Sequence, residues 1–408
     1  MKDLHQRIVI IGAGPAGLTA AETLREKGYK NITILEKSNR AGGKCFSFEH
    51  EQRFFELGAG IIASNNKIIF HLAEKFGVKI VPVKFDTAML FVGQEKPTLK
   101  KIVSLVHEIF FTYRKLAKRY RKIVELGFKN LDPSVCVPFS VWAARHNLLH
   151  LSEQFAYLFT GWGYGYFDEI PAAYILKYYS WELLQVFLKK QIFRFPGGIQ
   201  HLWITVAAAH KVLYNVSIQK IERREGVAIT TATEKLQFDV MIITSPLDEA
   251  LQYLDAGVEE TSLFTQIIYC DYRTYACFVK NFPRQDGYLS QNYNSSRAGH
   301  PVFWHLRHHD MNLYTFYVLG DWKISDQEVL ENIHTMIRDH GGTLEKTHKV
   351  VHWKYFPHVN SENMKNGYFD ILENLQGERH TYYAGELLNF STVGMSSAYA
   401  QQLVERNF

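Results

Sequence analysis

The sequence has little of several features that would assign a protein to an easily recognised class. It contains no run of about 18 apolar residues, the length that a membrane-spanning helix needs. Its most apolar long stretch, residues 102–113, is interrupted by His107 and Glu108. The first residues also lack the longer apolar segment and the small-residue cleavage site of a signal peptide. We therefore expect a protein of the cytoplasm, without a leader or a transmembrane helix.

Cysteine pairs and unbalanced charge are also absent. The four cysteines (Cys45, Cys136, Cys270 and Cys277) form no CxxC motif and no disulfide framework, which fits a reducing compartment. The 46 Lys and Arg against 41 Asp and Glu leave a net charge of +5, too small to indicate a nucleic-acid partner. The histidines within residues 300–309 have none of the usual metal-ligand spacings, so we expect no metal site.

The sequence does contain enough apolar residues, 47% of 408, to build two or three domains. Residues 7–11 predict a buried strand and residues 31–35 a second strand that ends on Glu36, with a helix between them. The first strand runs directly into Gly12-Ala13-Gly14-Pro15-Ala16-Gly17. This βαβ arrangement is typical of a dinucleotide-binding fold.

Each part of this motif has a physical reason. Gly12 allows a tight turn, Gly14 lets the backbone approach a pyrophosphate, and Gly17 permits close packing of helix against strand. The helix N-terminus at Pro15-Ala16 offers free N–H groups to the phosphates. Glu36 can accept hydrogen bonds from the adenosine ribose, and its charge disfavours the 2′-phosphate of NADP.

A second glycine-rich segment distinguishes FAD from NAD. Glu36-Lys37 is followed by Gly43-Lys44 and then by Gly58-Ala59, so glycines recur soon after the ribose-binding acid. This spacing indicates a longer cofactor that continues past the loop towards an isoalloxazine ring. The pattern resembles the flavin-containing amine oxidase and phytoene desaturase superfamily.

Other motifs of that superfamily can be matched in order along the chain. They are the PxGG turn at 195–200, a strand at 215–221 whose Val216 backbone would hold the adenine, a buried strand at 239–246, an aromatic segment at 353–357, and a strand at 381–386 whose Glu386 would bind the ribityl chain. The resemblance implies FAD, and since no cysteine lies near residues 390–395, we expect it to be non-covalent. The expected cofactor contacts are Gly12, Gly14, Pro15, Ala16, Glu36, Lys37, Gly43, Lys44, Gly58, Ala59, Val216, Gly385 and Glu386.

The fold class that follows is α/β, with a Rossmann-like FAD-binding domain, an inserted mixed-sheet substrate domain and an inserted helical domain. We expect the FAD-binding domain to comprise residues 1–80, 195–250 and 375–408, the substrate-binding sheet domain 81–99 and 251–374, and the helical domain 100–194. Within the sheet domain, hydrophobic patterns predict strands at 273–280, 301–307 and 313–319, and a helix between Ser325 and Gly341.

Aromatic residues are concentrated in residues 155–195, where 14 of 41 are Phe, Trp or Tyr. The strings Gly163-Tyr164-Gly165-Tyr166-Phe167-Asp168 and Tyr355-Phe356-Pro357-His358-Val359 resemble the polyunsaturated fatty acid double-bond isomerase branch of the superfamily. The resemblance implies that flavin N5 takes a hydride from an allylic carbon of a bound lipid and returns it elsewhere, giving a conjugated diene. It also implies that Phe187 shields the substrate, and that Tyr164, Tyr355 and Phe356 contact it.

One position departs from that branch. Its members carry a basic residue for the fatty acid carboxylate shortly after the second flavin segment, but the aligned position here is Thr87. Lys84 is the nearest cation, and we include it among the expected substrate contacts. Two alternatives therefore stay open: an FAD-dependent oxidase or desaturase resembling amine oxidases, and a non-catalytic protein that binds flavin or lipid.

A further segment suggests a surface partner. Residues 100–129 contain nine Lys and Arg but only two Glu. Apolar residues recur among them at helical spacing: Ile102, Leu105, Val106, Ile109, Leu116, Ile123 and Val124. A basic amphipathic helix can lie on an anionic membrane, which predicts a peripheral membrane contact. The alternative is a surface helix whose apolar face packs on its own domain. The oligomeric state does not follow from the sequence.

Overall fold

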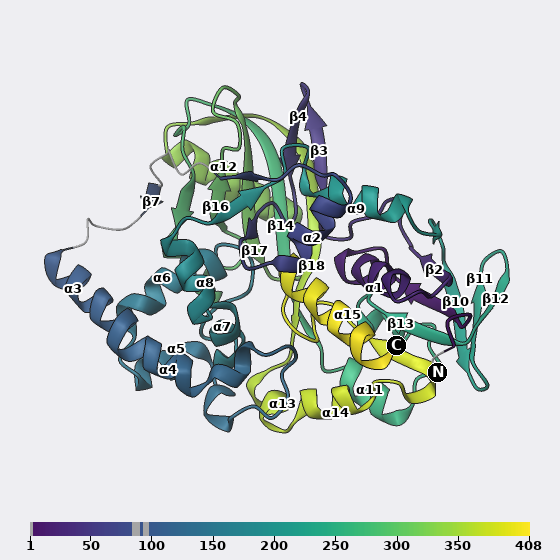
Figure 1. The fold of residues 1–408 in the computed structure, drawn as a ribbon. Helices are drawn as coiled ribbons and strands as arrows, with labels where there is room; N and C mark the ends of the chain where they lie inside the picture. The colour runs from purple at the N-terminus through teal and green to yellow at the C-terminus, as the bar shows by residue number, and fades with distance from the viewer. Residues whose placement is uncertain (1–2, 84–89, 93–97) are drawn as a thin grey trace.

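The computed structural model describes residues 3–83, 90–92 and 98–408 (Figure 1). A five-stranded parallel sheet in the order β19-β13-β1-β2-β9 forms its dinucleotide-binding layer. The strands are β1 (Arg7–Ile11), β2 (Asn31–Leu35), β9 (Val212–Leu213), β13 (Val240–Ile243) and β19 (Thr381–Tyr383). Strands that are neighbours in space thus come from distant parts of the chain. The predicted α/β fold with a Rossmann-like sheet is confirmed, whereas the exact domain boundaries stay a prediction.

Helices cover this sheet, which explains why its central strands are apolar throughout. α1 (Pro15–Glu26) starts directly after the glycine turn, with Pro15 at its first position, where the missing N–H has no helical partner to lose. α15 (Val393–Asn407) packs along α1, so the last helix of the described chain lies beside the first (Figure 1).

A six-stranded sheet in the order β18-β14-β17-β16-β15-β7 forms the second large layer. Its strands are β7 (Leu90–Val92), β14 (Ile268–Lys280), β15 (Gly287–Leu289), β16 (Pro301–His305), β17 (Leu313–Gly320) and β18 (Thr343–His358). The three predicted strands correspond to β14, β16 and β17, although β14 begins earlier, at Ile268. The predicted helix is α12 (Asp326–Asp339), which buries Val329, Ile333 and Ile337 against one face of this sheet.

Helices fill most of the chain from residue 99 to residue 188 and lie on the left of Figure 1. They are α3 (Leu99–His107), the π-helical η1 (Glu108–Tyr113), α4 (Arg114–Arg119), η2 (Arg121–Val124), η3 (Pro133–Val135), α5 (Phe139–Arg145), α6 (Leu149–Phe159), α7 (Ala172–Tyr178) and α8 (Trp181–Leu188). None of the helices in the described ranges is long and apolar enough to cross a membrane.

The remaining elements are short and connect these layers. They are the strands β3 (Ser47–His50), β4 (Arg53–Glu56), β5 (Ile62–Ala63), β6 (Val81–Pro82), β8 (Ile192–Arg194), β10 (Ile218–Arg223), β11 (Val227–Thr231) and β12 (Lys235–Phe238), and the helices α2 (Lys67–Lys75), α9 (Ile199–Ala208), α10 (Leu247–Ala250), α11 (Val258–Phe264), α13 (Ser361–Lys365), α14 (Tyr368–Asn374), η4 (Ser290–Asn292), η5 (Ser295–Arg297) and η6 (Glu378–His380). The strand predicted at 215–221 is wrong at its start. Val216 precedes β10, because its N–H donates to the carbonyl oxygen of Glu36 at 2.9 Å instead of joining a ladder.

A buried ion pair connects β10 to α11. Arg223 has a fully buried side chain and donates to Glu260 at 2.6 and 2.7 Å and to Asp255 at 2.7 Å. The Tyr383 hydroxyl on β19 and the Gly257 N–H also donate to Glu260. Burial alone would raise the pKa of Glu260, but the hydrogen bonds from Arg223 and Tyr383 lower it to about 2.

We expect Glu260→Gln to lower the free energy of unfolding at pH 7 by about 3 kcal/mol, because it leaves Arg223 buried without its full counter-charge. Ionised Glu260 stabilises the fold above its ordinary pKa of 4.5, and this contribution is lost as the pH falls towards 2. Urea unfolding should therefore depend less on pH in the variant, between about pH 5 and pH 3, than in the unchanged protein. The exposed neighbour substitution Glu259→Gln is the control. Identical pH profiles for Glu260→Gln and the unchanged protein would contradict this role.

Candidate functional site

The glycine turn after β1 brings backbone against backbone. Gly12 has φ +105°, and a Cβ on Gly17 would lie 2.0 Å from the Gly12 carbonyl oxygen, so the helix can start this close to the strand only with glycine there. The loop at Gly43 packs on the same turn, since a Cβ on Gly43 would lie 3.2 Å from the Cα of Gly14. The Gly42 N–H donates to the Ala13 carbonyl oxygen at 2.9 Å and fixes this approach.

Glu36 lies at the carboxyl end of β2, as the motif predicts. Its carboxylate accepts hydrogen bonds from the N–H groups of Ala13 and Ser38, each at 2.8 Å, which holds it beside the glycine turn. Val216 lies beside Glu36 as well, because its N–H donates a hydrogen bond to the Glu36 carbonyl oxygen. Lys37 is directed elsewhere: its Nζ pairs with Glu249 at 2.9 Å.

The second loop connects to the end of the chain. Lys44 Nζ lies 2.9 Å from both carboxylate oxygens of Glu386. The Ala59 N–H donates to the Lys44 carbonyl oxygen at 3.2 Å, and a Cβ on Gly58 would lie 1.9 Å from that oxygen. Gly385 has φ +120° and would place a Cβ 3.3 Å from the Thr244 carbonyl oxygen. The predicted cofactor residues are therefore assembled from three distant segments.

The sequence at residues 394–398 predicts the start of a last helix whose N-terminus faces the flavin or its phosphates, and α15 does begin there, at Val393. Thr392 caps the helix by accepting the Met395 N–H at 3.1 Å. Asn389 bridges two parts of the chain: its Oδ1 accepts the Gly127 N–H at 3.2 Å and its Nδ2 donates to the Met395 carbonyl oxygen at 2.9 Å. Ser391 Oγ is buried and has no hydrogen-bond partner among the described residues.

These features fit FAD. The side-chain-free surface at Gly12, Gly14 and Gly43 leaves room for a pyrophosphate next to the N-terminus of α1, where free N–H groups and the helix dipole favour anions. Glu36 is held where a ribose would follow. The unpartnered Ser391 hydroxyl offers a hydrogen bond near the start of α15.

A wall of aromatic side chains lies next to Glu386. It consists of Tyr164, Tyr178, Tyr355, Phe356 and Phe390, here called the aromatic wall. The ring of Phe390 lies 5.0 Å from Tyr164, 5.2 Å from Tyr178 and 5.2 Å from Phe356 between centroids. Phe356 has φ +45°, a left-handed conformation that non-glycine residues rarely adopt, and these contacts hold it there. Tyr178 and Phe390 were missed in the sequence because aromatic residues there could equally belong to a core.

The tyrosines of the aromatic wall and the neighbouring His358 are uncharged at neutral pH. Burial, with a smaller contribution from Glu386, raises the pKa of Tyr164 to about 12. Burial likewise raises the pKa of Tyr355. Burial lowers the pKa of the neighbouring His358 to about 4, so its imidazole is neutral. The wall therefore offers apolar faces rather than an acid or a base.

From this wall a column of stacked rings runs across the six-stranded sheet. Each successive pair has its rings within 30° of parallel, and the centroid distances are 5.5, 5.2, 6.0, 5.3 and 4.6 Å along the order Tyr164, Tyr355, Tyr272, Tyr317, Phe303, Tyr288. The last five rings come from β18, β14, β17, β16 and β15, which are adjacent in that order. One face of the sheet is thus lined by aromatic rings.

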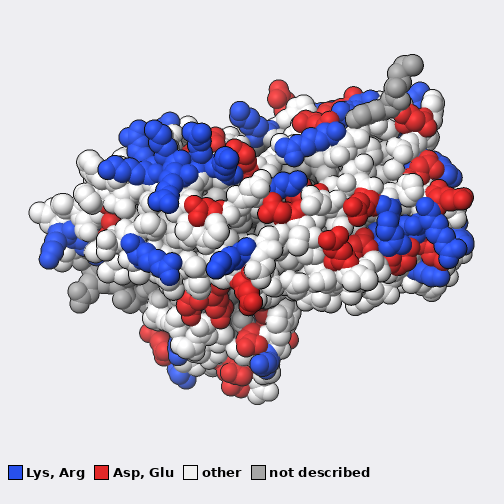
Figure 2. Space-filling view, turned by 90° about the horizontal axis from the view of Figure 1, so that it is seen from below, with Lys and Arg blue, Asp and Glu red and all other residues white. Residues whose placement is uncertain are grey.

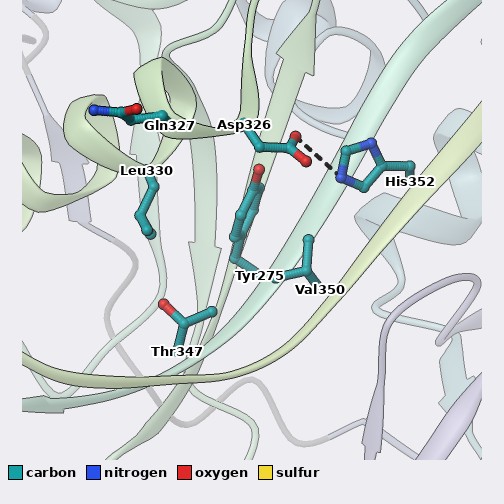
Figure 3. A pocket seen from close by; sticks show the side chains of 7 residues that line it. All are labelled: Tyr275, Asp326, Gln327, Leu330, Thr347, Val350 and His352. Atoms are coloured by element: carbon teal, nitrogen blue, oxygen red, sulfur yellow. Dashed lines mark ion pairs between the residues drawn. The ribbon is translucent and has the colours of Figure 1, made fainter.

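A separate cavity of about 420 Å³ lies on the opposite, α12-covered face (Figure 3). It is lined in part by Tyr275 and by His352, whose Nε2 lies 3.1 Å from Asp326. Tyr275 and Tyr272 are three residues apart on β14 and project to opposite faces, so the sheet separates this cavity from the aromatic column. The described residues include no group of three or more His, Cys, Asp or Glu that could hold a metal ion.

The predicted substrate contacts are only partly brought together. Tyr164, Tyr355 and Phe356 meet in the aromatic wall. Phe187 is half-buried on α8 and packs against the main core. Lys84 and Thr87 lie outside the described residues.

We expect Gly17→Ala to purify without flavin, since the added Cβ would clash with the Gly12 carbonyl oxygen and displace the turn. Gly197→Ala is the control, because its Cβ would meet nothing closer than His201 at 3.9 Å. The measurement is the ratio of flavin to protein absorbance, with far-UV circular dichroism to establish folding. A folded Gly17→Ala variant with full flavin content would show that the turn does not control binding.

Comparison with known proteins agrees with this site. The sequence profile of the family described as "Flavin containing amine oxidoreductase" matches residues 15–396. A solved fatty acid isomerase from P. acnes, described as CLA-producing, superposes with a TM-score of 0.93 and 30% identity over 100% of both chains. Cyclohexylamine oxidase from Brevibacterium oxydans IH-35A shares the fold, with a TM-score of 0.69 and 16% identity over 98% of this chain and 99% of that one.

Curated relatives match over a short stretch only. An L-amino-acid oxidase of Mus musculus is 42% identical over 77 residues, which is 18% of this chain and 12% of that protein. An amine oxidase of Oncorhynchus mykiss is 36% identical over 84 residues, 20% of this chain and 16% of the relative. The chain belongs to the flavin-containing amine oxidoreductase family, and it is an FAD-dependent isomerase or oxidoreductase.

Proposed function

We propose that the protein is an FAD-dependent isomerase that converts a polyunsaturated fatty acid or a related lipid into a conjugated diene. The observation that carries this proposal is the similarity to the P. acnes fatty acid isomerase, which extends over the whole of both chains at 30% identity. The aromatic wall beside the cofactor site supports it, because a polyene needs apolar contact along its length.

The residues of the aromatic wall suit a cationic hydrocarbon. FAD bound beside this wall would supply a hydride acceptor, so that an allylic hydride could leave one carbon of the lipid and return to another without net oxidation. Tyr164, Phe356 and Phe390 are each at most 5% exposed, so they exclude water that would trap a delocalised carbocation. Their ring faces stabilise positive charge by cation–π contact. Because the proposed reaction moves a hydride, it needs no side-chain acid or base, and no proton transfer is assigned to the tyrosines or His358.

An oxidase is the second candidate, and the local matches to L-amino-acid and amine oxidases favour it. Those matches cover at most 20% of this chain. In an oxidase the electrons would leave the substrate and pass to oxygen, giving peroxide. In an isomerase they return to the substrate.

We expect the purified holoenzyme to convert linoleate to a product with conjugated-diene absorbance, without oxygen consumption or peroxide. The reaction should proceed equally well under anaerobic conditions, since the reaction needs no terminal electron acceptor. Peroxide formed stoichiometrically from an amine or amino acid would instead identify an oxidase. A protein that binds flavin but changes neither a panel of polyunsaturated lipids nor a panel of amines would be a binding protein, and the proposal would fall.

We expect Phe187→Ala to lower kcat/KM for the lipid at least about tenfold, because a shielding aromatic side chain contributes apolar contact with the reacting chain. The flavin content should not change, since Phe187 is not among the residues of the glycine loops. Leu188→Ala, at a neighbouring side chain that is 65% exposed, is the matched control. Equal kinetics for both variants would remove Phe187 from the substrate site.

A further inference from the structure

The helix α3 leaves its apolar face without a partner. None of its residues is buried, although half of them are large and apolar. Leu105 on α3 and Ile109 on η1 turn partly towards the core. The opposite side exposes a row of large apolar residues at helical spacing, here called the apolar stripe: Leu99, Ile102, Val103, Val106, Phe110 and Phe111, each 44–76% exposed. The amphipathic segment predicted from the sequence thus has two apolar faces, of which only one packs on the protein.

A cluster of cations follows the apolar stripe directly in the chain. It consists of Arg114, Lys115, Lys118, Arg119, Arg121 and Lys122, here called the basic cluster. All six are exposed, and none forms an ion pair with another described residue. Figure 2 shows Lys and Arg side chains gathered on the left, the side on which Figure 1 places α3 and α4. Unpaired cations at this density favour an anionic surface.

A groove of about 650 Å³ lies beside the basic cluster. The basic cluster borders it through Arg114, Lys118 and Arg121, and residues of α2 and α15 form the other side. Trp181, at the start of α8, lines the groove as well. Arg114 lies over the Trp181 ring at 5.5 Å, and Phe110 of the apolar stripe contacts the same ring edge-on at 6.1 Å. Stripe, tryptophan and groove are therefore continuous.

The floor of the groove is held by a buried lysine. Lys177 on α7 is buried, and its Nζ donates to the carbonyl oxygens of Ile123, Glu125 and Gly127 at 3.0, 2.7 and 2.7 Å. These three bonds fix the backbone from which Val124 and Leu126 line the groove. The groove is thus a supported part of the fold rather than a gap between loose segments.

We infer that this face docks on an anionic phospholipid bilayer, with the apolar stripe in the headgroup–acyl boundary and the basic cluster against the lipid headgroups. Three observations favour a membrane over a protein partner: the apolar residues form a row along one helix, unpaired cations follow it, and a tryptophan lies where the two meet. The inference goes beyond the proposed reaction, since it assigns a lipid-binding surface outside the aromatic wall. It does not depend on that reaction, because vesicle binding is measured without turnover.

The experiment is flotation of the intact holoenzyme with vesicles of phosphatidylcholine alone or of phosphatidylcholine with phosphatidylserine. We expect binding to the anionic vesicles only, weakened by salt because the exposed charges are screened. Val103→Asp with Phe111→Asp, and separately Lys118→Glu with Arg121→Glu, should each lower the vesicle affinity at least about tenfold. All four positions are exposed, so the variants should fold, which circular dichroism and flavin content would establish.

Matched controls exist on other parts of the surface. Val258→Asp changes an apolar residue that is 91% exposed on α11, and Arg224→Glu with Lys235→Glu reverses the same number of charges near β11. Both controls should bind vesicles like the unchanged protein. Absence of binding to anionic vesicles, or equal affinity for the stripe and cluster variants and their controls, would overturn the inference. So would a dimer in solution that Val103→Asp with Phe111→Asp dissociates, since the stripe would then be a protein interface.

Discussion

The close approach of two glycine loops at one edge of the parallel sheet is the constraint on which the cofactor site depends. Where the loop meets the turn, a Cβ on Gly43 would lie only 3.2 Å from the Cα of Gly14, so backbone groups form the contact between the two loops. This contact also positions Lys44, the next side chain of the second loop, so that it reaches Glu386. The close packing of the two glycine loops near the start of the chain thereby fixes the ion pair between Lys44 and Glu386, which lies in the last segment of the chain.

The two faces of the six-stranded sheet differ in role: one packs against α12, and the other carries aromatic rings towards the candidate site. On one face, the aliphatic residues of α12 pack on sheet residues such as Trp304 and Phe316, while the other face carries the stacked aromatic column that ends at Tyr164. Where β18 reaches the site, the left-handed conformation of Phe356 costs on the order of 1–3 kcal/mol, which the surrounding rings must offset. The left-handed backbone turns the Phe356 ring into the aromatic wall. In an ordinary extended strand, side chains alternate between the two faces, and the ring would point away from the wall.

Much of the cofactor site could be predicted from the sequence, because glycine and the ribose-binding acid act through the backbone and at fixed spacing. Gly12, Gly17 and Glu36 take the positions that the βαβ motif requires. Val216 was expected within a strand, but its hydrogen bond to Glu36, 180 positions away, holds it in a loop. Local strand propensity contains no information about such a distant partner.

The aromatic wall could be predicted only through Tyr164, Tyr355 and Phe356, which lie in recognisable strings. Phe390 and Tyr178 join it by tertiary packing, and a buried ring looks the same in a sequence whether it belongs to a core or to a site. The helical periodicity of residues 100–129 likewise located the apolar positions without deciding which of the two faces would pack inward. The direction of Lys37 depends on Glu249, which is remote in sequence.

The Lys44–Glu386 pair has a consequence for how the protein is made. Its two residues are 342 positions apart, and β19, which precedes Glu386, is an outer strand laid against β13. At about 5–20 residues per second, a ribosome completes the glycine turn tens of seconds before it adds the acid that closes the loop. From the completion of β13 until β19 is made, the edge of β13 that later pairs with β19 is open, and an open strand edge can pair with another chain. The Lys44–Glu386 contact therefore forms only after translation has passed the last strand of the parallel sheet.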